Sequence, residues 1–322
     1  MKAVIVNSDS SMSWAEAEQP HVGAGDVLIR VRATAINRAD LMQRRGAYPP
    51  PAGASLIMGL ECAGEVAAVG EGVSRWKKGD QVCALLSGGG YAEYAIAPHG
   101  SVLPVPTGFS FEQAAALPEV FATAWLNLFI EAALQPGEKV VLHAGASGVG
   151  TAGIQLCKAF SNPCFVTAGS DEKIKACIGL GASAGSNRYS GGFLELAAAF
   201  AGAGGVDVIL DPVGGAYLLD NLKLLGMNGR LVLIGLMGGS KAEIELALMM
   251  MKRLRIIGST LRARPVDEKA KVMRQLEERV WPKLTSGDIK PIIDTVLPIQ
   301  EIAAAHDLVA SDKTLGKVVL SL

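Results

Sequence analysis

The sequence predicts an α/β protein in which a β-rich domain is interrupted by a doubly wound parallel sheet with its helices. Three observations support this class: short strand-like segments up to about residue 118, alternating apolar strands and helices over 119–261, and a tail over 262–322 that continues neither rhythm. With 322 residues, of which 50% are hydrophobic, the chain can bury two cores. We therefore expect domains at 1–118 and 119–261, with 262–322 returning to complete the first.

The first part reads as a series of short strands separated by Gly, Pro and Asp. We expect strands at 2–6, 26–37, 63–70, 80–85 and 91–97. The segment 38–48 has the polar start and closing glycine of a short helix. Pro118 interrupts the helical stretch 111–134 and should break or kink it, so we place the domain boundary there.

The second part alternates apolar strands with helical segments, which predicts a parallel sheet covered on both faces. Its strands are expected at 138–144, 163–168, 206–211, 230–236 and 254–259, with a weaker one at 183–187. In the tail we expect one charged helix over 267–284, followed by the segments 291–299, 301–311 and 316–322, with which the tail returns to complete the first domain.

Charge and cysteine content narrow the function classes. The net charge of −1, with both signs interspersed, shows no electrostatic footprint for nucleic acid. Only four apolar residues follow Lys2, too few for a secretory signal, and the five cysteines form no C-x-x-C pair. The uncharged stretch 140–157 contains four glycines and makes a poor membrane span. We expect a cytoplasmic protein without a membrane segment.

A glycine-rich turn joins the strand at 138–144 to the following helix. Its residues are Gly145, Ala146, Ser147, Gly148, Val149 and Gly150, a G-x-G-x-x-G pattern with Ser147 at the second glycine. Between a strand and a helix, this pattern predicts a dinucleotide whose pyrophosphate meets the helix N-terminus. We expect Gly145 to permit the tight turn, and Gly148 and Gly150 to allow close approach. The alternative is a turn without a ligand.

The end of the next strand indicates which dinucleotide binds. There the chain carries Gly169, Ser170 and Lys173, and Arg188 follows the weaker strand. Hydroxyl and cationic side chains suit a ribose 2′-phosphate, whereas an NAD site places an acidic residue on the 2′-hydroxyl. We therefore predict NADPH as the cofactor. Asp171 argues against this if it points inward, and the cations could alternatively be solvated surface charges.

These motifs resemble the zinc-free, zeta-crystallin-like quinone oxidoreductases of the medium-chain dehydrogenase/reductase superfamily. The matching blocks include INRADLMQRRGAYPPPAGAS, GLECAGEVAAVG, LLSGGGYAEY and HAGASGVGTAGIQL, and the resemblance covers essentially the whole chain. It implies a GroES-like β-rich catalytic domain split by a Rossmann domain. It also implies a homodimer or tetramer formed through the edge of the nucleotide-binding sheet, at about 230–260.

The same resemblance argues against a metal site. Zinc-dependent relatives have Cys where this chain has Asn37, and His where it has Leu60 in Gly59-Leu60-Glu61. Neither residue is a plausible zinc ligand. The four histidines show no metal or triad spacing, and we expect structural roles for His21, His99, His143 and His306.

The resemblance further implies which side chains line the nicotinamide cleft. Asn37 would hold the cofactor or a substrate carbonyl through its amide, and Tyr48 would bond a substrate oxygen or relay a proton. Without the resemblance, Asn37 reads as a turn cap and Tyr48 as a packing residue. Further expected contacts to the cofactor are Thr123, Leu236, Met237, Gly238 and Lys317. Alternatively, Thr123 only packs within its helix, residues 236–238 form an ordinary loop, and Lys317 is a surface lysine.

We accordingly expect an NADPH-dependent, zinc-independent quinone oxidoreductase with a small-molecule quinone as substrate, ortho-quinones being favoured. Without a metal, the acceptor must take hydride readily by itself, as a quinone or activated enone does. One alternative is an NADPH-dependent enone or enoyl thioester reductase with Tyr48 as proton donor. An alternative of another class is a non-catalytic nucleotide- or RNA-binding structural protein.

Overall fold

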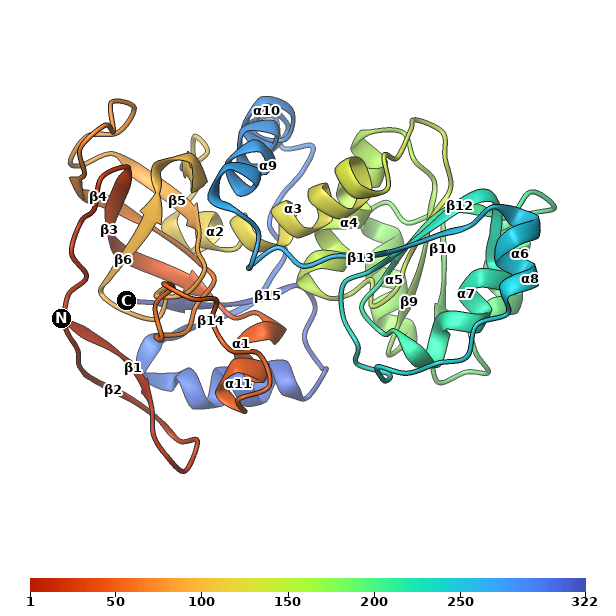
Figure 1. Cartoon of the computed structure of the whole chain (residues 1–322), viewed down its shortest axis with the longest axis horizontal. Coiled ribbons are helices and arrows are strands. Elements are labelled where there is room, and N and C mark those ends of the chain that lie inside the picture. The colour runs from red at the N-terminus through yellow and green to blue at the C-terminus, as the bar shows by residue number, and fades with distance from the viewer. The chain divides into compact units, whose positions relative to one another are not determined.

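The structure is a computed structural model that describes residues Met1–Leu322 (Figure 1). The chain divides into two compact units. Unit 1 comprises Met1–Ala122 with Leu261–Leu322, and unit 2 comprises Thr123–Thr260. Unit 2 is thus inserted into the sequence of unit 1, and each is described by itself.

Unit 1 is built on a seven-stranded sheet whose main path runs β14-β15-β3-β4-β5-β7, with β6 paired to β3. A separate hairpin pairs the first two strands. The bounds are β1 Lys2–Val6, β2 Met12–Glu16, β3 Asp26–Ala35, β4 Glu61–Val69, β5 Gln81–Leu85, β6 Tyr94–Pro98, β7 Val102–Pro104, β14 Ile293–Pro298 and β15 Lys317–Ser321. All expected strands of this part are present. Sequence patterning missed β2, which is only partly buried, and β7, which has three residues.

The C-terminal segment returns to unit 1 through the sheet. β15 pairs antiparallel with β3, so that Val319 lies opposite Ala35, and β14 lies parallel on its other side. This pairing carries Lys317 to the end of β3, beside the start of the first helix.

The helices of unit 1 are short. They are α1 Arg38–Arg44, η1 His99–Ser101, α2 Phe111–Ala115, α9 Val266–Arg279, α10 Trp281–Thr285, η4 Ile299–Glu301 and α11 Ile302–Ala310. The helix expected over 267–284 is interrupted at Val280, and Pro282, which lacks an N–H donor, sits in the first turn of α10. At Pro118 the expected break is present: α2 ends at Ala115 and α3 (Pro118–Trp125) begins at the proline.

Unit 2 is a six-stranded parallel sheet in the order β10-β9-β8-β11-β12-β13. Its strands, all six predicted, are β8 Val140–Leu142, β9 Cys164–Ala168, β10 Ala184–Asn187, β11 Val206–Asp211, β12 Leu225–Leu233 and β13 Arg255–Gly258. The order runs outward from β8 in both directions, which confirms the doubly wound fold. Because all strands are parallel, their carboxyl ends share one edge of the sheet.

Helices cover both faces of this sheet (Figure 1). Those of unit 2 are η2 Leu126–Glu131, α4 Gly148–Ala159, α5 Asp171–Leu180, α6 Leu194–Ala201, η3 Gly215–Tyr217, α7 Leu218–Leu224 and α8 Leu246–Lys252. Fully buried side chains such as Phe165, Ile209 and Leu222 fill the core between sheet and helices. In unit 1 a comparable core surrounds Ile29, Val66 and Trp76. No helix of either unit combines the length and apolarity needed to cross a bilayer.

Candidate functional site

The glycine-rich turn leads from β8 into α4 at the carboxyl edge of the parallel sheet. Ser147 is the N-cap residue of α4, and its Oγ accepts from the N–H of Gly150 at 3.1 Å. The serine at the second glycine position therefore has a structural reason, because it caps the helix. The hydroxyl proton of Ser147 stays available to an anion at the helix N-terminus.

The roles of the individual glycines differ from those expected. The tight turn is made by Ala144, whose φ is +54°, and Gly145 does not have a positive φ. Gly145 is needed for space, since a Cβ there would lie 2.7 Å from Val166 Cβ. At Gly150, a Cβ would lie 2.5 Å from the carbonyl oxygens of Ala144 and Gly145. Gly148 and Val149 form the first turn of α4, where unpaired N–H groups face the turn.

The loop after β9 carries a second set of predicted residues. Ser170 caps α5 by accepting from the Lys173 N–H at 3.3 Å. A Cβ at Gly169 would lie 3.7 Å from Arg188 Nη2, so Arg188 lies against this loop. Gly169, Ser170, Lys173 and Arg188 are thus brought together at the ends of β9 and β10. Hydroxyl and cationic groups gathered in this way fit a phosphate.

Two further residues, Tyr189 and Asp171, bear on the interpretation of this loop as a phosphate site. The guanidinium lies over the Tyr189 ring, 4.8 Å from its centroid, and Nη2 donates to the Tyr189 hydroxyl at 2.7 Å. Tyr189 is 73% exposed, and sequence reasoning missed it. Asp171, the residue that argued against NADPH, accepts from Asn187 Nδ2 at 3.0 Å. Its carboxylate is therefore engaged on the neighbouring strand end.

A buried polar chain beneath the glycine-rich turn was also missed. Asn221 Nδ2 donates to Asp211 Oδ2 at 2.9 Å, which leaves Asn221 Oδ1 facing His143 Nε2 at 2.8 Å. His143 Nε2 must then carry the proton, and Nδ1 accepts from the Thr167 hydroxyl at 3.1 Å. Burial lowers the pKa of His143 to about 4 and raises the pKa of Asp211 to about 6. The neutral histidine predicted to be structural is confirmed as part of this chain.

The loops after β11 and β12 interlock at the same edge of the sheet. Gly238 N–H donates to the Val213 carbonyl at 2.7 Å, and Met237 N–H donates to that of Pro212 at 3.2 Å. Leu236 and Met237 remain 57% and 46% exposed, so both offer apolar surface to a ligand. Thr123, the first residue of unit 2, accepts through its carbonyl from Asn127 Nδ2.

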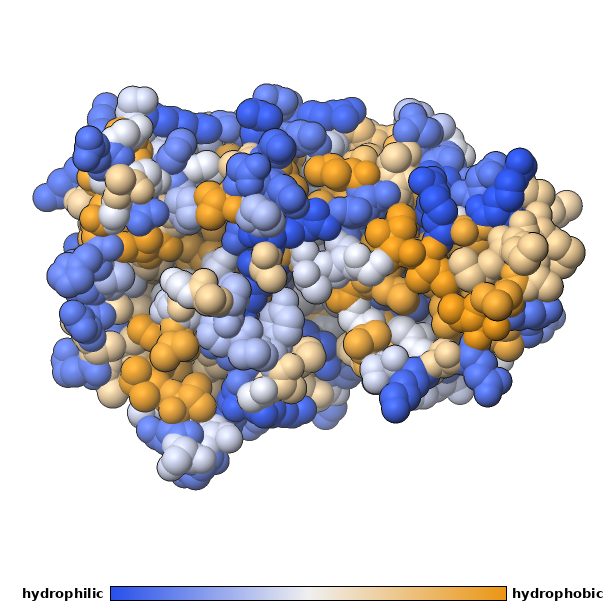
Figure 2. Space-filling model, in the orientation of Figure 1, coloured by the Kyte–Doolittle hydropathy of each residue, from blue (hydrophilic) through white to orange (hydrophobic).

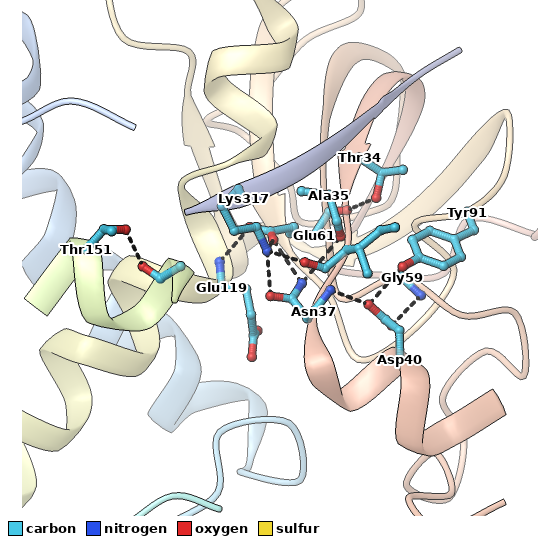
Figure 3. A network of polar contacts seen from close by, with 12 residues as sticks. Thr34, Ala35, Asn37, Asp40, Gly59, Glu61, Tyr91, Glu119, Thr151 and Lys317 are labelled. Atoms are coloured by element: carbon cyan, nitrogen blue, oxygen red, sulfur yellow. Dashed lines mark hydrogen bonds and ion pairs between the residues drawn. The ribbon is translucent and has the colours of Figure 1, made fainter. Parts of the chain in front are cut away.

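In unit 1, a charged cluster forms where β3, β4 and β15 meet, and Figure 3 shows Asn37, Glu61 and Lys317 pointing toward one another. Lys317 Nζ lies 2.8 Å from Glu61 Oε1, and both side chains are buried. Nζ also donates to Asn37 Oδ1 at 2.6 Å and to the Ile36 carbonyl at 2.7 Å. The ammonium group of Lys317, expected to contact the cofactor, is therefore engaged by three partners inside unit 1.

The same cluster fixes the start of α1. Asp40 Oδ2 accepts from the Asn37 backbone N–H at 2.8 Å and from the Tyr91 hydroxyl at 2.9 Å, and Oδ1 accepts from the Gly59 N–H at 3.1 Å. Burial raises the pKa of Asp40 to about 6, and these hydrogen bonds oppose the rise. Asn37 is the N-cap residue of α1, and its side chain forms hydrogen bonds with Glu61 and Lys317.

Tyr48 lies in a second group of polar side chains in unit 1. The buried guanidinium of Arg262 lies 5.4 Å from its ring centroid, and Arg262 Nε donates to the Ser87 carbonyl at 2.8 Å. Neither contact uses the Tyr48 hydroxyl. Partial burial raises the pKa of Tyr48, and the charge of Glu119 adds to this. Burial, followed by repulsion from Glu61, raises the pKa of Glu119 to about 8.

The cluster does not fit a zinc ion. Asn37 and Leu60 stand at the positions expected for ligands, and Leu60 is a buried apolar side chain. Glu61 Oε1 already accepts from Lys317 and Asn37, while Oε2 accepts from the Glu119 N–H at 2.9 Å. No group of three or more His, Cys, Asp and Glu side chains in the chain is placed to hold a metal ion.

The structure brings the predicted residues Ser170, Lys173 and Arg188 together in unit 2 and Asn37 with Lys317 in unit 1, beside partners that the sequence did not indicate. Glu61, Glu119, Arg262, Tyr189 and Asn221 were not singled out. The available signal for Glu61 was a lone carboxylate in the apolar run GLECAG, since such a charge must be paired when buried. Arg262 carried no comparable signal, because its partners lie far away in the sequence.

The sequence and structure are similar to known oxidoreductases. Residues 23–107 match the alcohol dehydrogenase GroES-like domain family, and residues 148–278 match the zinc-binding dehydrogenase family. The quinone oxidoreductase of Rattus norvegicus is 34% identical over 298 residues, covering 92% of this chain and 89% of that protein.

Two solved structures agree over nearly the whole chain. The CurK enoyl reductase is 29% identical with a TM-score of 0.85, covering 99% of this chain and 98% of that one. A mycobacterial protein in complex with NADPH is 25% identical with a TM-score of 0.87, covering both chains fully. With its GroES-like and Rossmann-like domains, this chain belongs to the quinone oxidoreductase-like members of the medium-chain dehydrogenase/reductase superfamily.

Proposed function

We propose that this protein is a zinc-independent, NADPH-dependent oxidoreductase that reduces quinones, with ortho-quinones as the favoured class. The observation that carries the proposal is that the charged side chains beside Asn37 are already bonded to other groups of the protein. Lys317 and Glu61 use their polar atoms within unit 1, so neither is free to polarise a substrate carbonyl. An acceptor that takes hydride without strong activation suits such a site, and a quinone is one. The quinone oxidoreductase of rat, at 34% identity, supports this class.

The proposed cofactor site lies in unit 2. The first turn of α4, with Gly145, Ser147, Gly148, Val149 and Gly150, would hold the pyrophosphate. Ser170, Lys173 and Arg188 would hold the 2′-phosphate beside Gly169. Thr123, Leu236, Met237 and Gly238 would flank the nicotinamide. When bound, NADPH supplies the hydride, and the NADPH complex of the mycobacterial neighbour supports this choice.

The proposed substrate residues lie in unit 1. Reduction of an ortho-quinone to a catechol takes one hydride and one proton for each molecule. The Tyr48 hydroxyl, which its contacts to Arg262 leave unused, is proposed to donate the proton to a substrate oxygen. Its raised pKa keeps this hydroxyl protonated at neutral pH, as a donor must be.

The first experiment compares NADPH oxidation by the purified protein with an ortho-quinone and with a trans-2-enoyl thioester. Preferential turnover of the quinone is expected. Tyr48→Phe should lower kcat for the quinone while leaving the NADPH dissociation constant unchanged, because only the hydroxyl is lost. Full activity of Tyr48→Phe would remove the hydroxyl from the mechanism.

A second experiment tests cofactor choice by direct binding. NADPH is expected to bind more tightly than NADH, and Arg188→Gln should reduce that preference by about tenfold, the loss of one charge-assisted contact. Lys175→Gln, at an exposed position of α5, serves as the matched control for a lost cation. Equal affinity of the wild type for both cofactors would contradict the NADPH assignment.

A second candidate function is reduction of enones or enoyl thioesters. The likeness to the CurK enoyl reductase favours it, and the same residues would serve, with Tyr48 giving its proton after hydride addition to the β-carbon. Preferential turnover of the thioester would establish this alternative. Tight NADPH binding with turnover of neither acceptor would favour the non-catalytic binding role.

We also propose a homo-oligomer that forms through β13 and α8 of unit 2. β13 is an edge strand, and exposed apolar side chains lie on or just before α8, namely Ile244, Leu246, Met250 and Met251. Figure 2 shows this hydrophobic area. Met250→Glu should shift the protein toward the monomer in sedimentation.

The five buried free cysteines are consistent with a reducing, cytoplasmic location.

A further inference from the structure

We propose that Lys317 and Glu61 together fix the orientation of the Asn37 side-chain amide, so that Asn37 meets its ligand as a hydrogen-bond acceptor. This inference rests on the proposed function only in taking Asn37 to face the cofactor or the substrate. It gives Lys317 and Glu61 the role of positioning residues. It also specifies what chemical group the ligand must present.

The amide can adopt only one orientation between its two charged neighbours. Asn37 Oδ1 accepts from Lys317 Nζ at 2.6 Å, and Asn37 Nδ2 donates to Glu61 Oε1 at 2.9 Å (Figure 3). An ammonium group has no acceptor and a carboxylate has no donor. Rotating the amide by half a turn would place its NH2 group against the ammonium and its oxygen against the carboxylate. The rotated state therefore loses both hydrogen bonds and gains two repulsive contacts.

The two neighbours are themselves held in place. Lys317 is 4% exposed, donates to Ile36 and Asn37, and forms an ion pair with Glu61. Glu61 is fully buried, and its Oε2 accepts from the backbone N–H of Glu119. Because both side chains are buried and their charged groups are engaged within unit 1, the pair presents no exposed group to a ligand. Its effect on a ligand is exerted through Asn37.

What remains free on Asn37 defines its ligand. The second Nδ2 hydrogen faces the Ala35 carbonyl, with a nitrogen to oxygen distance of 3.4 Å. The Asp40 backbone N–H approaches the Asn37 side chain as in a capping box but makes no hydrogen bond to it, so a donor from a ligand can still reach the second lone pair of Oδ1. Asn37 is partly exposed, unlike both of its neighbours. A ligand must therefore bring an N–H or O–H donor. The carboxamide of the nicotinamide and a hydroxyl of the catechol product qualify, whereas a quinone carbonyl, expected earlier as a partner of Asn37, does not.

The test removes the two charges together. The variant Lys317→Met with Glu61→Gln keeps side-chain volumes similar, and the introduced glutamine keeps its oxygen on the Glu119 N–H and turns its NH2 group toward Asn37, so Asn37 is no longer held with its oxygen toward the ligand. We would measure dissociation constants for NADPH and for its reduced 3-acetylpyridine analogue, which lacks the carboxamide N–H. The wild type should prefer NADPH by about three- to tenfold, as expected for one hydrogen bond, and the double variant should show a ratio near one.

A second arm separates the two possible donors. If the catechol hydroxyl is the partner, the cofactor ratio stays constant and inhibition by the catechol product weakens in the double variant, by about three- to tenfold. Either result supports the inference. If neither the ratio nor the product inhibition changes, it is overturned. Asn37→Ala, which leaves the ion pair intact, must give the same loss, and unchanged binding in that variant overturns the inference even if the double variant does not fold.

A matched control applies the same chemical change elsewhere in the sheet. Arg32 and Glu65 on β3 and β4 form a partly exposed pair at 2.8 Å, so Arg32→Met with Glu65→Gln should leave both binding measurements unchanged. A loss of the ratio in this control would overturn the assignment to Lys317 and Glu61. A protein that shows the binding effects but reduces no quinone would contradict the proposed function alone. Normal quinone turnover without the binding effects would contradict this inference alone.

Discussion

The two functional regions of this protein are constructed in opposite ways. In unit 2, the turn before α4 is one continuous segment whose backbone N–H groups and lack of side chains are proposed to hold the cofactor. In unit 1, the Asn37 cluster joins side chains from distant segments, and Lys317 lies 280 residues from Asn37. The first region depends on local conformation and the second on tertiary structure. Substitutions in the two regions should therefore fail for different reasons.

The largest effect is expected at the buried ion pair of unit 1. Lys317→Met leaves Glu61 charged and fully buried, and should lower the free energy of unfolding by about 3–5 kcal/mol. Unit 2 contains a comparable pair, Arg230 with Glu138, but Glu138 is 23% exposed, so Arg230→Met should cost less. Denaturant unfolding of both variants measures the difference. Equal losses would show that burial does not distinguish the two pairs.

A smaller loss of stability, caused by steric overlap, is expected in the turn before α4 of unit 2. The added Cβ in Gly150→Ala meets two backbone carbonyl oxygens at 2.5 Å, and backbone cannot yield as a flexible side chain does. We expect about 3 kcal/mol of destabilisation, near the upper end of overpacking effects, together with weaker NADPH binding. Calorimetry and cofactor titration on one sample check both. Wild-type stability with unchanged affinity would mean that the turn can relax.

Buried histidines provide a third contrast between the units: burial lowers the pKa of both His306 and His143 to about 4, but only His143 has hydrogen-bond partners. Neither ring nitrogen of His306 has a hydrogen-bond partner, and burial, with Arg44 nearby, lowers its pKa to about 4. Below pH 6.5, His306 is protonated in the unfolded chain, whereas in the folded state it stays neutral down to about pH 4. The free energy of unfolding therefore falls as the pH drops from 6.5 to 4. His306→Leu should therefore be more stable than wild type at pH 5, by about 2 kcal/mol.

The partnered histidine of unit 2 serves as the control for this prediction. His143→Leu leaves Asn221 and Thr167 without their partner, so it should lose about 1–3 kcal/mol at pH 7. Both variants remove a histidine whose pKa is lowered to about 4, so urea unfolding at pH 7, where the lost hydrogen bonds alone count, distinguishes them, and unfolding at pH 5 measures the proton-linked gain of each. A His306→Leu variant as acid-sensitive as the wild type would show that other groups control this pH range.

The smallest effect is expected at a glycine with no steric reason to be one. Gly179 lies within α5, and a Cβ there would meet nothing within 4 Å. Gly179→Ala should stabilise unit 2 by about 0.4–1 kcal/mol, because alanine restricts the unfolded chain. A shift of the melting temperature upward, with NADPH affinity unchanged, would sharpen the contrast with Gly150. A downward shift would indicate a neighbour not captured by this geometry.

The same contrast explains how far the sequence alone could be read. The six strands of unit 2 and the turn before α4 could be predicted, because apolar runs and a strand–glycine–helix pattern are local signals. Even there, conformation went partly unpredicted: the positive φ belongs to Ala144, although a glycine was expected to make the turn. Local patterns identify the segment more reliably than the role of each residue.

In unit 1 the limits were set by distance along the chain. Asn37 and Lys317 were named from a family resemblance, but that they touch depends on β15 pairing with β3. Glu61 shares its two oxygens among three separate segments, and nothing in its immediate neighbours specifies them. Arg262 reaches Ser87 and Tyr48 by the same kind of long-range packing. Such contacts follow from topology and not from periodicity.

The position of β15 also dictates an order of events during synthesis. Unit 2 is continuous and ends at Thr260, so its sheet can form while the remainder of unit 1 is still being translated. Unit 1 must wait, since the end of β3 at Ala33–Ala35 lacks its β15 partner and Glu61 has no counter-ion until Lys317 emerges. A chain that stops short of Lys317 would carry a finished nucleotide-binding half beside an unfinished one. Such a product could bind cofactor and still be recognised as unfolded by the cell's proteases.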